Sequence, residues 1–255
     1  MNYKTVLITG GTGLIGFEMI SHFLKLPNYK VVFISRSQTK ISTVIDNIPA
    51  DKKIFLHGIC IDLEKENSSA ELVEYLEKNE IFPDILINNA RNANYLKLDE
   101  NGKAKRDDFQ NEFLMNVVVP YEISIALSAM KNSKLCNIIN ISSIYGIVAP
   151  NPNLYDGSLK RSPIQYGVTK SALIHLTKEL AVRFADKKIR VNALSLGGVE
   201  GRVNDEFIKK YAKLCPQEKM LKSEDIIGAV EFLASDSSSG MTGHNLVVDG
   251  GWTAW

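Results

Sequence analysis

The sequence predicts a doubly wound α/β fold with a seven-stranded, mostly parallel sheet and helices on both faces. Short apolar runs rich in β-branched residues alternate with helix-length amphipathic segments along the chain. Several of these runs are continuously hydrophobic, as expected of strands that are covered on both faces. Strand–helix alternation of this kind implies right-handed βαβ units.

The predicted elements follow one another without a linker or an internal repeat, so we expect residues 1–255 to form a single domain. Strands are expected at Lys4–Thr9, Lys30–Ser35, Ile54–Cys60, Ile85–Asn88, Asn137–Ser142, Arg190–Leu196 and Asn245–Val248. Helices are expected near Leu14–Leu26, Thr39–Ile48, Ala70–Lys78, Phe109–Met130, Gln165–Ala185 and Ser223–Ala234. Three longer segments, 91–108, 144–164 and 198–222, follow the ends of strands, where ligands bind in open α/β sheets. We expect them to contact substrate, with 198–222 forming a lid.

Composition and charge argue against several classes of protein. Hydrophobic residues make up 45% of the chain and charged residues 23%, which is ordinary for a globular protein. Thirty Lys and Arg against 29 Asp and Glu give a formal net charge of +1, so the basic excess typical of a nucleic-acid-binding protein is absent. No apolar run approaches the roughly 20 residues that span a bilayer. With no signal peptide before the first strand, we expect a cytoplasmic protein without a nucleic-acid or membrane partner.

The three cysteines predict free thiols rather than a metal site. Cys60, Cys136 and Cys215 are widely spaced, without a CxxC pair or histidines at zinc-ligand spacing. Cys60 and Cys136 lie in apolar runs, so we expect both to be buried.

A glycine-rich turn follows the first strand and opens the first helix. Its glycines allow a tight turn and let backbone N–H groups approach a pyrophosphate, which the positive end of the helix also attracts. A turn without a ligand is the alternative interpretation, but the strand–turn–helix context favours a dinucleotide cofactor. The expected binding residues in this turn are Gly10, Thr12, Gly13, Leu14, Ile15 and Gly16.

The ends of the second and third strands bear on the choice of cofactor. An acidic residue after the second strand would bind the ribose 2′-hydroxyl of NAD, whereas an arginine suits the 2′-phosphate of NADP. This chain has Ser35 and Arg36 there. We therefore expect NADP(H), with NAD(H) as the alternative if Arg36 only faces solvent. Asp62 and Leu63 close the third strand and are expected near the adenine, although a helix N-cap explains Asp62 nearly as well.

The candidate chemical groups lie in the central part of the chain. Tyr166 and Lys170 are four residues apart in a predicted helix and therefore share a face, where the ammonium favours the phenolate form of the tyrosine. Such a phenol can serve as a general acid or base. Ser143, at the end of the fifth strand, can polarise a substrate carbonyl. Asn116 lies within a predicted helix, where Asn is mildly unfavourable; a satisfied structural amide is the alternative to a functional role.

These motifs resemble the short-chain dehydrogenase/reductase family over essentially the whole chain. The matching segments are Thr9-Gly10 with the glycine turn, Asp62-Leu63, Asn88-Asn89-Ala90, Asn116, Ile141-Ser142-Ser143, Tyr166-x-x-x-Lys170, Arg190-Val191-Asn192, Phe232-Leu233-Ala234-Ser235, Thr242-Gly243 and Val248-Asp249-Gly250-Gly251.

The resemblance implies a Rossmann fold and a catalytic tetrad of Asn116, Ser143, Tyr166 and Lys170. Tyr166 would donate or accept the proton, Ser143 would orient the carbonyl, Lys170 would bind the nicotinamide ribose, and Asn116 would hold a water of the proton relay. The resemblance also implies a homodimer or homotetramer formed through the two long helices, Phe109–Met130 and Gln165–Ala185. Further cofactor contacts are implied for Asn89, Ala90, Tyr166, Lys170, Gly197 and Val199.

Four features depart from the usual pattern of that family. The glycines at positions 10, 13 and 16 have the spacing of its longer, sugar-nucleotide-modifying branch. Arg91 stands where Asn-Asn-Ala is normally followed by Gly, and it places a cation beside cofactor or substrate. Ser143 and Tyr166 are separated by a longer stretch than usual, and Gly197-Gly198 replaces Pro-Gly.

The long stretch before Tyr166 leads to a prediction about the substrate. It is polar, whereas a steroid or acyl-chain pocket would show more bulky apolar residues. It resembles loops of family members from bacterial surface-glycan pathways, including flagellin modification. We therefore predict interconversion of a ketone and a secondary alcohol on a small, polar, sugar-like substrate; a solvated loop that never touches substrate is the alternative. The residues considered for substrate contact are Asn151, Asn153, Tyr155, Asp156, Lys160 and Arg161.

Two other functions remain open at this point. The glycine spacing is also that of sugar-nucleotide epimerases and dehydratases, which show no net consumption of free cofactor. A cofactor-binding regulator without turnover is the other alternative, although it would have no need of Tyr166.

Overall fold

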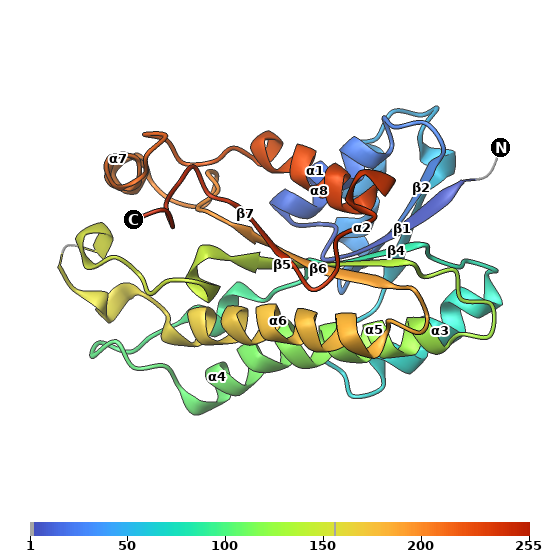
Figure 1. Ribbon diagram of the computed structural model, residues 1–255, viewed down its shortest axis with the longest axis horizontal. Coiled ribbons are helices and arrows are strands. Elements are labelled where there is room, and N and C mark those ends of the chain that lie inside the picture. Colours follow the sequence, from blue (N-terminus) through green and yellow to red (C-terminus); the bar gives the residue numbers. More distant parts are fainter. Residues whose placement is uncertain (1–2, 156) are drawn as a thin grey trace.

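The computed structural model describes residues 3–155 and 157–255; Asp156, one of the residues considered for substrate contact, lies outside them. Within these residues the centre of the molecule is a sheet of seven parallel strands in the order β3-β2-β1-β4-β5-β6-β7 (Figure 1). The predicted doubly wound fold is confirmed. The strands are β1 Lys4–Thr9, β2 Tyr29–Ser35, β3 Leu56–Cys60, β4 Ile85–Asn88, β5 Asn137–Ser143, β6 Arg190–Leu196 and β7 Asn245–Val248.

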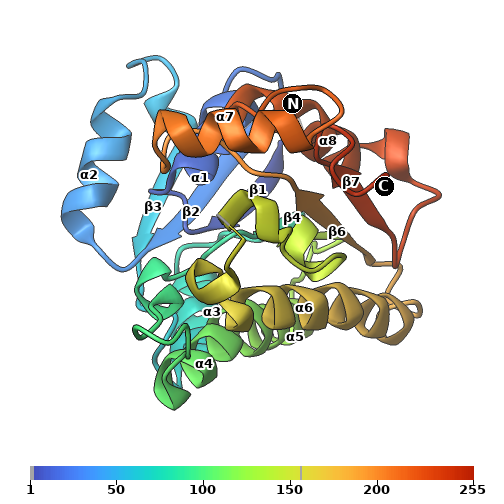
Figure 2. The same ribbon diagram turned by 90° about the vertical axis from the view of Figure 1, so that its left-hand side faces the viewer.

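Helices cover both faces of the sheet, and alternate strand residues point to opposite layers (Figures 1 and 2). In β1, Val6 and Ile8 face one apolar core and Leu7 faces the other. The first core contains α1 (Leu14–Phe23), α2 (Gln38–Asp46) and α8 (Ile227–Ala234). The second contains α3 (Ser68–Lys78), α5 (Val119–Ala129) and α6 (Ile164–Arg183). Burial on both faces explains the continuous hydrophobic runs of these strands.

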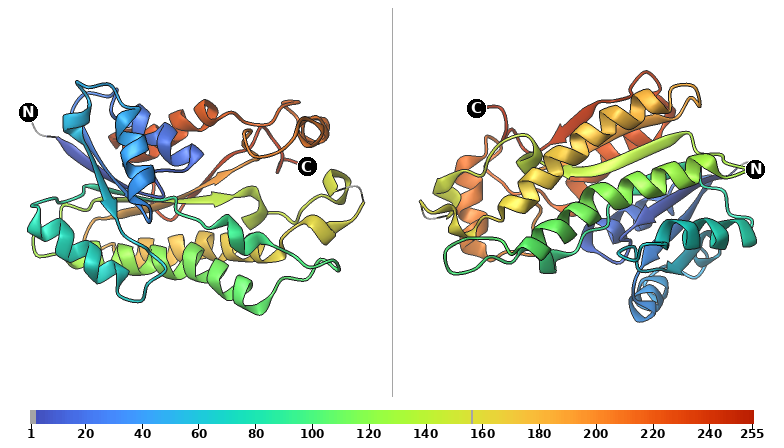
Figure 3. Two further views of the ribbon diagram at one scale, coloured as in Figure 1. Left: turned by 180° about the vertical axis from the view of Figure 1, so that it is seen from behind. Right: turned by 90° about the horizontal axis from the view of Figure 1, so that it is seen from below.

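The strand order reverses between β1 and β4, which creates a crevice at the carboxyl edge of the sheet. Segment 144–164 and helix α7 (Asp205–Leu214) lie at this same end of the molecule (Figures 1 and 3). These two segments are therefore placed at the mouth of the crevice, and the third segment expected to contact substrate, 91–108, also contributes residues to it.

Several local expectations were wrong. β3 begins at Leu56 rather than Ile54, because Ile54 lies in a short 3-10 turn and is 80% exposed. Cys60 and Cys136 are exposed and Cys215 is buried. Cys60 ends the edge strand with its side chain on the side opposite to buried Ile59, so apolar neighbours in sequence did not imply burial.

The predicted long helix Phe109–Met130 is not regular. It consists of α4 (Arg106–Phe113), a π-helical segment Leu114–Val118 and α5. The run Arg106–Ala129 has the length and apolar composition of a membrane span, and 44% of its apolar stretch is buried inside the protein. In this fold it packs against α3 and α6, so its apolar side belongs to the core.

Candidate active site

A cavity of about 630 Å³ runs along the carboxyl edge of the sheet, a size typical of ligand sites. It brings together every residue that the sequence predicted to contact cofactor. These are Gly10, Thr12, Gly13, Leu14, Ile15, Gly16, Ser35, Arg36, Asp62, Leu63, Asn89, Ala90, Tyr166, Lys170, Gly197 and Val199. Of the predicted tetrad, Ser143 also lines the cavity, whereas Asn116 lies behind its wall, next to the lining residue Met115.

The glycine turn has the shape of a phosphate cradle. Gly10 has a φ of +68°, and a Cβ there would lie 2.8 Å from the Cα of Ala90. A Cβ on Gly16 would lie 2.4 Å from the Gly10 carbonyl oxygen, so neither position accepts a side chain. Gly13, the N-cap of α1, has more room, because the nearest atom to its Cβ position is the Gly10 carbonyl oxygen at 3.4 Å, and its backbone N–H donates to that same oxygen within the turn. This arrangement fits a dinucleotide pyrophosphate at the helix N-terminus.

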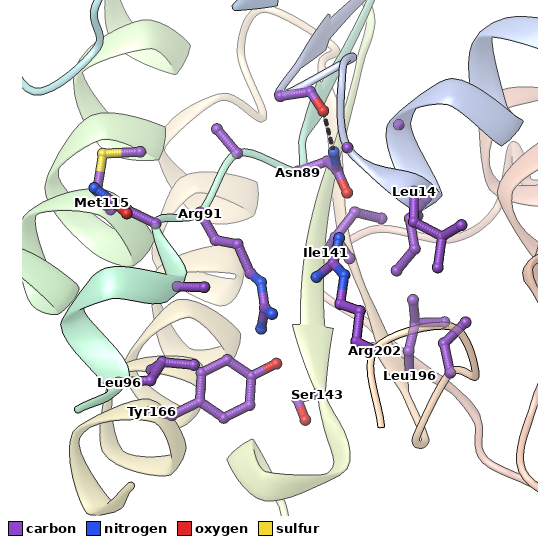
Figure 4. Close-up of a pocket in the computed structure, with 18 of the residues that line it drawn as sticks. Leu14, Asn89, Arg91, Leu96, Met115, Ile141, Ser143, Tyr166, Leu196 and Arg202 are labelled. Atoms are coloured by element: carbon purple, nitrogen blue, oxygen red, sulfur yellow. Dashed lines mark hydrogen bonds between the residues drawn. The ribbon is translucent and has the colours of Figure 1, made fainter. Parts of the chain in front are cut away.

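The fourth strand holds this turn in place. The Thr9 hydroxyl accepts hydrogen bonds from the backbone N–H groups of Asn89 and Ala90, at 2.9 and 3.0 Å. The Asn89 side-chain amide donates to the carbonyl oxygen of Thr9 and also to that of Gly10, and Figure 4 draws one of these hydrogen bonds. The Asn-Asn-Ala motif therefore ties the loop after β4 to the glycine turn after β1.

The part of the cavity next to the end of β2 contains both positively and negatively charged side chains. Arg36 pairs with Glu64 at 3.1 Å, and Glu64 also accepts hydrogen bonds from Asn92 and the Tyr95 hydroxyl. Burial and the Glu64 carboxylate raise the pKa of Tyr95 to about 12. Lys40 lines the cavity as a second cation, which the sequence interpretation missed. The signal was available, because Lys40 follows Arg36 by four residues, in the first turn of α2.

Asp62 does not cap the helix that follows it. Its carboxylate accepts a hydrogen bond from the backbone N–H of Glu64, and α3 begins only at Ser68. The N-cap interpretation is therefore wrong, and Asp62 remains a lining residue of the cavity.

Close packing of backbones places Tyr166 beside Ser143. A Cβ on Gly167 would lie 2.9 Å from the Tyr145 carbonyl oxygen, and a Cβ on Gly146 would lie 2.9 Å from the Lys170 carbonyl oxygen. These two glycines allow α6 to approach the turn that follows β5. As a result the Tyr166 hydroxyl points toward Ser143 across the cavity (Figure 4).

Lys170 is buried next to the Tyr166 ring. Its Nζ lies 5.9 Å from the ring centroid and donates a hydrogen bond of 2.8 Å to the Ile141 carbonyl oxygen. Burial lowers the pKa of Lys170 to about 8, with Glu112 opposing and Arg91 adding to the effect. An ammonium with this pKa is still charged at neutral pH but gives up its proton more readily than a surface lysine.

Asn116 is part of a buried polar group between α4 and α6. Its side-chain amide donates to Glu112 Oε1 at 2.6 Å and to Thr169 Oγ1 at 3.2 Å. Among the described residues its Oδ1 has no hydrogen-bond partner. Glu112 is 1% exposed, and burial raises its pKa. The sequence analysis did not identify Glu112, whose position four residues before Asn116 was the available signal.

Two arginines extend into the cavity on either side of its centre (Figure 4). The Cζ atom of Arg91 lies 5.9 Å from the Tyr166 ring centroid. Arg202 lies above the glycine turn, with Nη2 3.7 Å from the Cβ position of Gly13. Burial, with the charge of Arg91 in addition, lowers the pKa of Arg202.

The outer part of the cavity is aromatic. Segment 144–164 contributes Tyr145 and Tyr155, whose hydroxyls are 3.0 Å apart, and α7 contributes Phe207 and Tyr211. The ring of Tyr155 contacts Phe207 edge-on, with centroids 6.0 Å apart. The side of segment 144–164 that faces the site is therefore more apolar than its composition indicated.

Most polar residues considered for substrate contact do not reach this cavity. Asn151 and Asn153 are absent from its lining, and Lys160 and Arg161 line a separate surface depression with Asp99. Among the described residues considered for substrate contact, Tyr155 does line the cavity.

Comparison with known proteins extends the match beyond individual motifs. A family model described as Enoyl-(Acyl carrier protein) reductase matches residues 15–253. An uncharacterized oxidoreductase of Thermotoga maritima is 31% identical over 269 residues, covering 100% of both chains. Post-translational flagellin modification protein A of Campylobacter coli is 42% identical over 122 residues. These residues are 48% of this chain and 48% of that protein, so the match spans about half of the relative's length. The crystal structure of a short chain dehydrogenase from Leptospira borgpetersenii with bound NAD+ has a TM-score of 0.86 at 30% identity, covering 99% of this chain and 94% of that chain.

Proposed function

Because the chain belongs to the short-chain dehydrogenase/reductase family of oxidoreductases, we propose that it interconverts a ketone and a secondary alcohol on a polar, sugar-like substrate with NADP(H). The observation that carries this proposal is the group of Ser143, Tyr166 and Lys170 at the centre of one cavity with the glycine turn. When bound, the nicotinamide cofactor supplies or accepts the hydride.

The protein side of the reaction then follows from the positions of these groups. The Ser143 hydroxyl donates a hydrogen bond to the substrate oxygen and stabilises the charge that develops there. The Tyr166 hydroxyl, on the opposite wall, donates its proton to that oxygen in reduction and accepts one in oxidation. The Lys170 ammonium, 5.9 Å from the ring centroid, favours the phenolate that this exchange requires. Asn116 Oδ1 accepts a hydrogen bond from a water that returns the proton to Tyr166.

The proposed preference for NADP(H) rests on the two cations next to the end of β2, Arg36 and Lys40. Arg36 and Lys40 lie there with the hydroxyls of Ser35 and Thr12, which are 3.0 Å apart. Glu64 opposes a 2′-phosphate, but its ion pair with Arg36 is partly exposed, and exposed pairs contribute only about 0–1 kcal/mol. We expect the attraction between a 2′-phosphate and two cations to exceed the free energy lost when the Arg36–Glu64 pair is broken.

A sugar-like substrate is supported by the outer cavity and by one relative. Tyr145, Tyr155 and Phe207 offer flat apolar faces, and the two tyrosines add hydroxyl groups. This combination suits a small ring with several hydroxyls better than a long acyl chain. The relative from Campylobacter coli is named for flagellin modification, which is consistent with surface-glycan chemistry.

We further propose that the protein is a cytoplasmic homodimer or homotetramer that associates through α5 and α6. These helices lie side by side on one outer face (Figure 3, right), where Tyr121, Val168 and Val182 are 45%, 46% and 78% exposed. These exposed apolar side chains lie on the two helices through which the family resemblance implies association. Light scattering of the Val182→Glu variant, compared with the wild type, should reveal a smaller assembly; an unchanged mass would place the interface elsewhere.

The function is tested by following cofactor oxidation with NADPH and NADH on a panel of keto-sugars, sugar phosphates, sugar nucleotides and simple ketones. Turnover should favour NADPH, should occur on a keto-sugar class, and should vanish in Tyr166→Phe. Tight NADPH binding without net oxidation on any member of the panel would contradict the proposal and favour an epimerase, a dehydratase or a regulator.

A further inference from the structure

Arg91 is a cation without a protein partner at the centre of the cavity. Among the described residues, its guanidinium forms no ion pair and no hydrogen bond; it contacts the face of the Tyr166 ring. Its side chain leaves the loop after Asn89 and Ala90 and points across the cavity toward the reaction centre (Figure 4). A planar guanidinium presents several donors in a fixed fork that matches carboxylate and phosphate oxygens.

The other cations of the cavity already face anions or anion sites. Arg36 pairs with Glu64 at the end that we assign to the 2′-phosphate, with Lys40 nearby. Arg202 lies over the glycine turn, where a pyrophosphate would bind. Lys170 is buried near Glu112 and hydrogen-bonded to a backbone carbonyl. After these assignments Arg91 is the cavity cation that makes no ion pair or hydrogen bond among the described residues and has no ligand anion assigned to it, although its charge also acts on buried Glu112.

The position of Arg91 indicates that its ligand is the substrate. Lys170 Nζ and Arg91 Cζ each lie 5.9 Å from the Tyr166 ring centroid, so two cations lie near this ring. Arg91 therefore lies beside the ring whose hydroxyl exchanges a proton with the substrate. The aromatic groups of the outer cavity supply no charge, and we assign Arg202 to the pyrophosphate, so a charged substrate would depend on Arg91.

We propose that Arg91 binds an anionic oxygen group of the substrate, a carboxylate or a phosphate, close to the carbon that is oxidised or reduced. This inference rests on the proposed function, because it takes the group at Tyr166 to be the reacting carbonyl. It narrows a polar substrate to an anionic one and assigns the charge recognition to Arg91 in place of Lys160 and Arg161.

The test measures binding rather than turnover. Succinate, glycerol 3-phosphate and neutral glycerol are titrated calorimetrically into the free protein and into its NADPH complex, and the Kd of NADPH is measured separately by fluorescence. The variants are Arg91→Ala and Arg91→Lys. The matched control is Arg161→Ala, which removes an exposed arginine outside the cavity.

Wild-type protein should bind at least one of the two anions, and the one bound more tightly distinguishes a carboxylate from a phosphate substrate. Arg91→Ala should weaken that binding by about ten-fold or more, the usual range for a hydrogen-bonded charge, while Arg91→Lys retains part of it. The Kd of NADPH and the behaviour of Arg161→Ala should stay close to wild type.

Three results would overturn the inference: no anion binding by the wild type, anion binding that is the same in Arg91→Ala, or an Arg91→Ala variant that loses NADPH affinity as strongly as anion affinity. The last would assign Arg91 to the cofactor. A failure of the proposed function would look different, because a protein that does not bind NADPH would still bind the anions through Arg91.

Discussion

Replacing Lys170 with methionine should make the cofactor-free protein more stable at neutral pH while removing its turnover. The side chain is 6% exposed, and its ammonium must be held among buried groups for the proposed chemistry. Methionine has a similar length without the charge. The substitution therefore separates what Lys170 does for the reaction from what it costs the fold.

The pKa of Lys170 gives the size of the effect. The difference between its ordinary value of 10.5 and about 8 in the fold corresponds to about 3.4 kcal/mol, at about 1.4 kcal/mol per pKa unit. The attraction of Glu112 is already contained in this value, because it is one of its causes. Methionine leaves the Ile141 carbonyl oxygen without its donor, at a cost of about 1 kcal/mol. The expected gain at pH 7 is about 2 kcal/mol, which raises the Tm by roughly 5 °C in a chain of this size.

The pH dependence provides a second, independent check. Between about pH 8 and pH 10.5 the unfolded chain keeps the Lys170 proton that the folded chain has lost, so the stability of the wild type rises across this window. The advantage of Lys170→Met should therefore shrink as the pH rises, and near pH 10.5 the wild type should be the more stable of the two.

The assay is urea unfolding of cofactor-free protein at one protein concentration, at pH 7 and at pH 10. Lys178→Met is the control, because Lys178 lies on the same helix with its side chain exposed and should show neither effect. The reasoning fails if Lys170→Met is less stable than wild type at pH 7, or if the difference between the two proteins is the same at both pH values.

Three further changes test other parts of the cavity. Glu112→Gln should gain stability relative to wild type as the pH rises above 4.5. Burial raises the pKa of Glu112 in the fold, so above pH 4.5 the unfolded wild type releases a proton that the folded chain still holds, and the stability of the wild type falls. Urea unfolding at pH 5 and pH 7 measures this, and a constant difference would contradict it. Glu64→Gln should raise the preference for NADPH over NADH several-fold in a comparison of Kd values, because it frees Arg36 and removes a negative charge from the site; an unchanged ratio would show that no 2′-phosphate binds there. Gly16→Ala should abolish cofactor binding and cost about 1–3 kcal/mol of stability, because its Cβ would lie 2.4 Å from the Gly10 carbonyl oxygen. Gly13→Ala should keep the stability of the wild type, because the nearest atom to its Cβ position lies at 3.4 Å. Equal stability of the two variants would refute the steric argument.

Local signals were sufficient for the sheet and for most of the cavity lining. Strands such as β1 and β4 are read correctly because burial on both faces requires an unbroken apolar run, and parallel pairing then places their carboxyl ends at one edge. The glycine turn, Asn89 and Ser143 follow directly from that geometry, since each stands at or just after the end of a strand. Residues fixed by backbone position are those that sequence reasoning recovers.

Groups fixed by side-chain direction were not recovered. The pairing of Arg36 with Glu64 joins segments that share no local pattern, and only the fold shows that they meet. Lys160 and Arg161 have the composition of a substrate-binding loop, yet they lie on a 3-10 turn that faces away from the cavity. The π-helical segment at Asn116 leaves no clear sequence signal either, because it differs from α-helix by a single hydrogen-bond register.

The outer cavity depends on three parts of the chain that stabilise one another. Leu154 from segment 144–164, Tyr211 and Cys215 from the α7 region, and Trp252 near the carboxyl end form a third apolar cluster, separate from the two cores of the sheet. Trp252 stacks on Tyr211 with ring centroids 4.3 Å apart, and the Tyr211 hydroxyl accepts a hydrogen bond from the backbone N–H of Gly198. The turn after β6, which also lines the cofactor part of the cavity, is thereby connected to the same cluster as the substrate part.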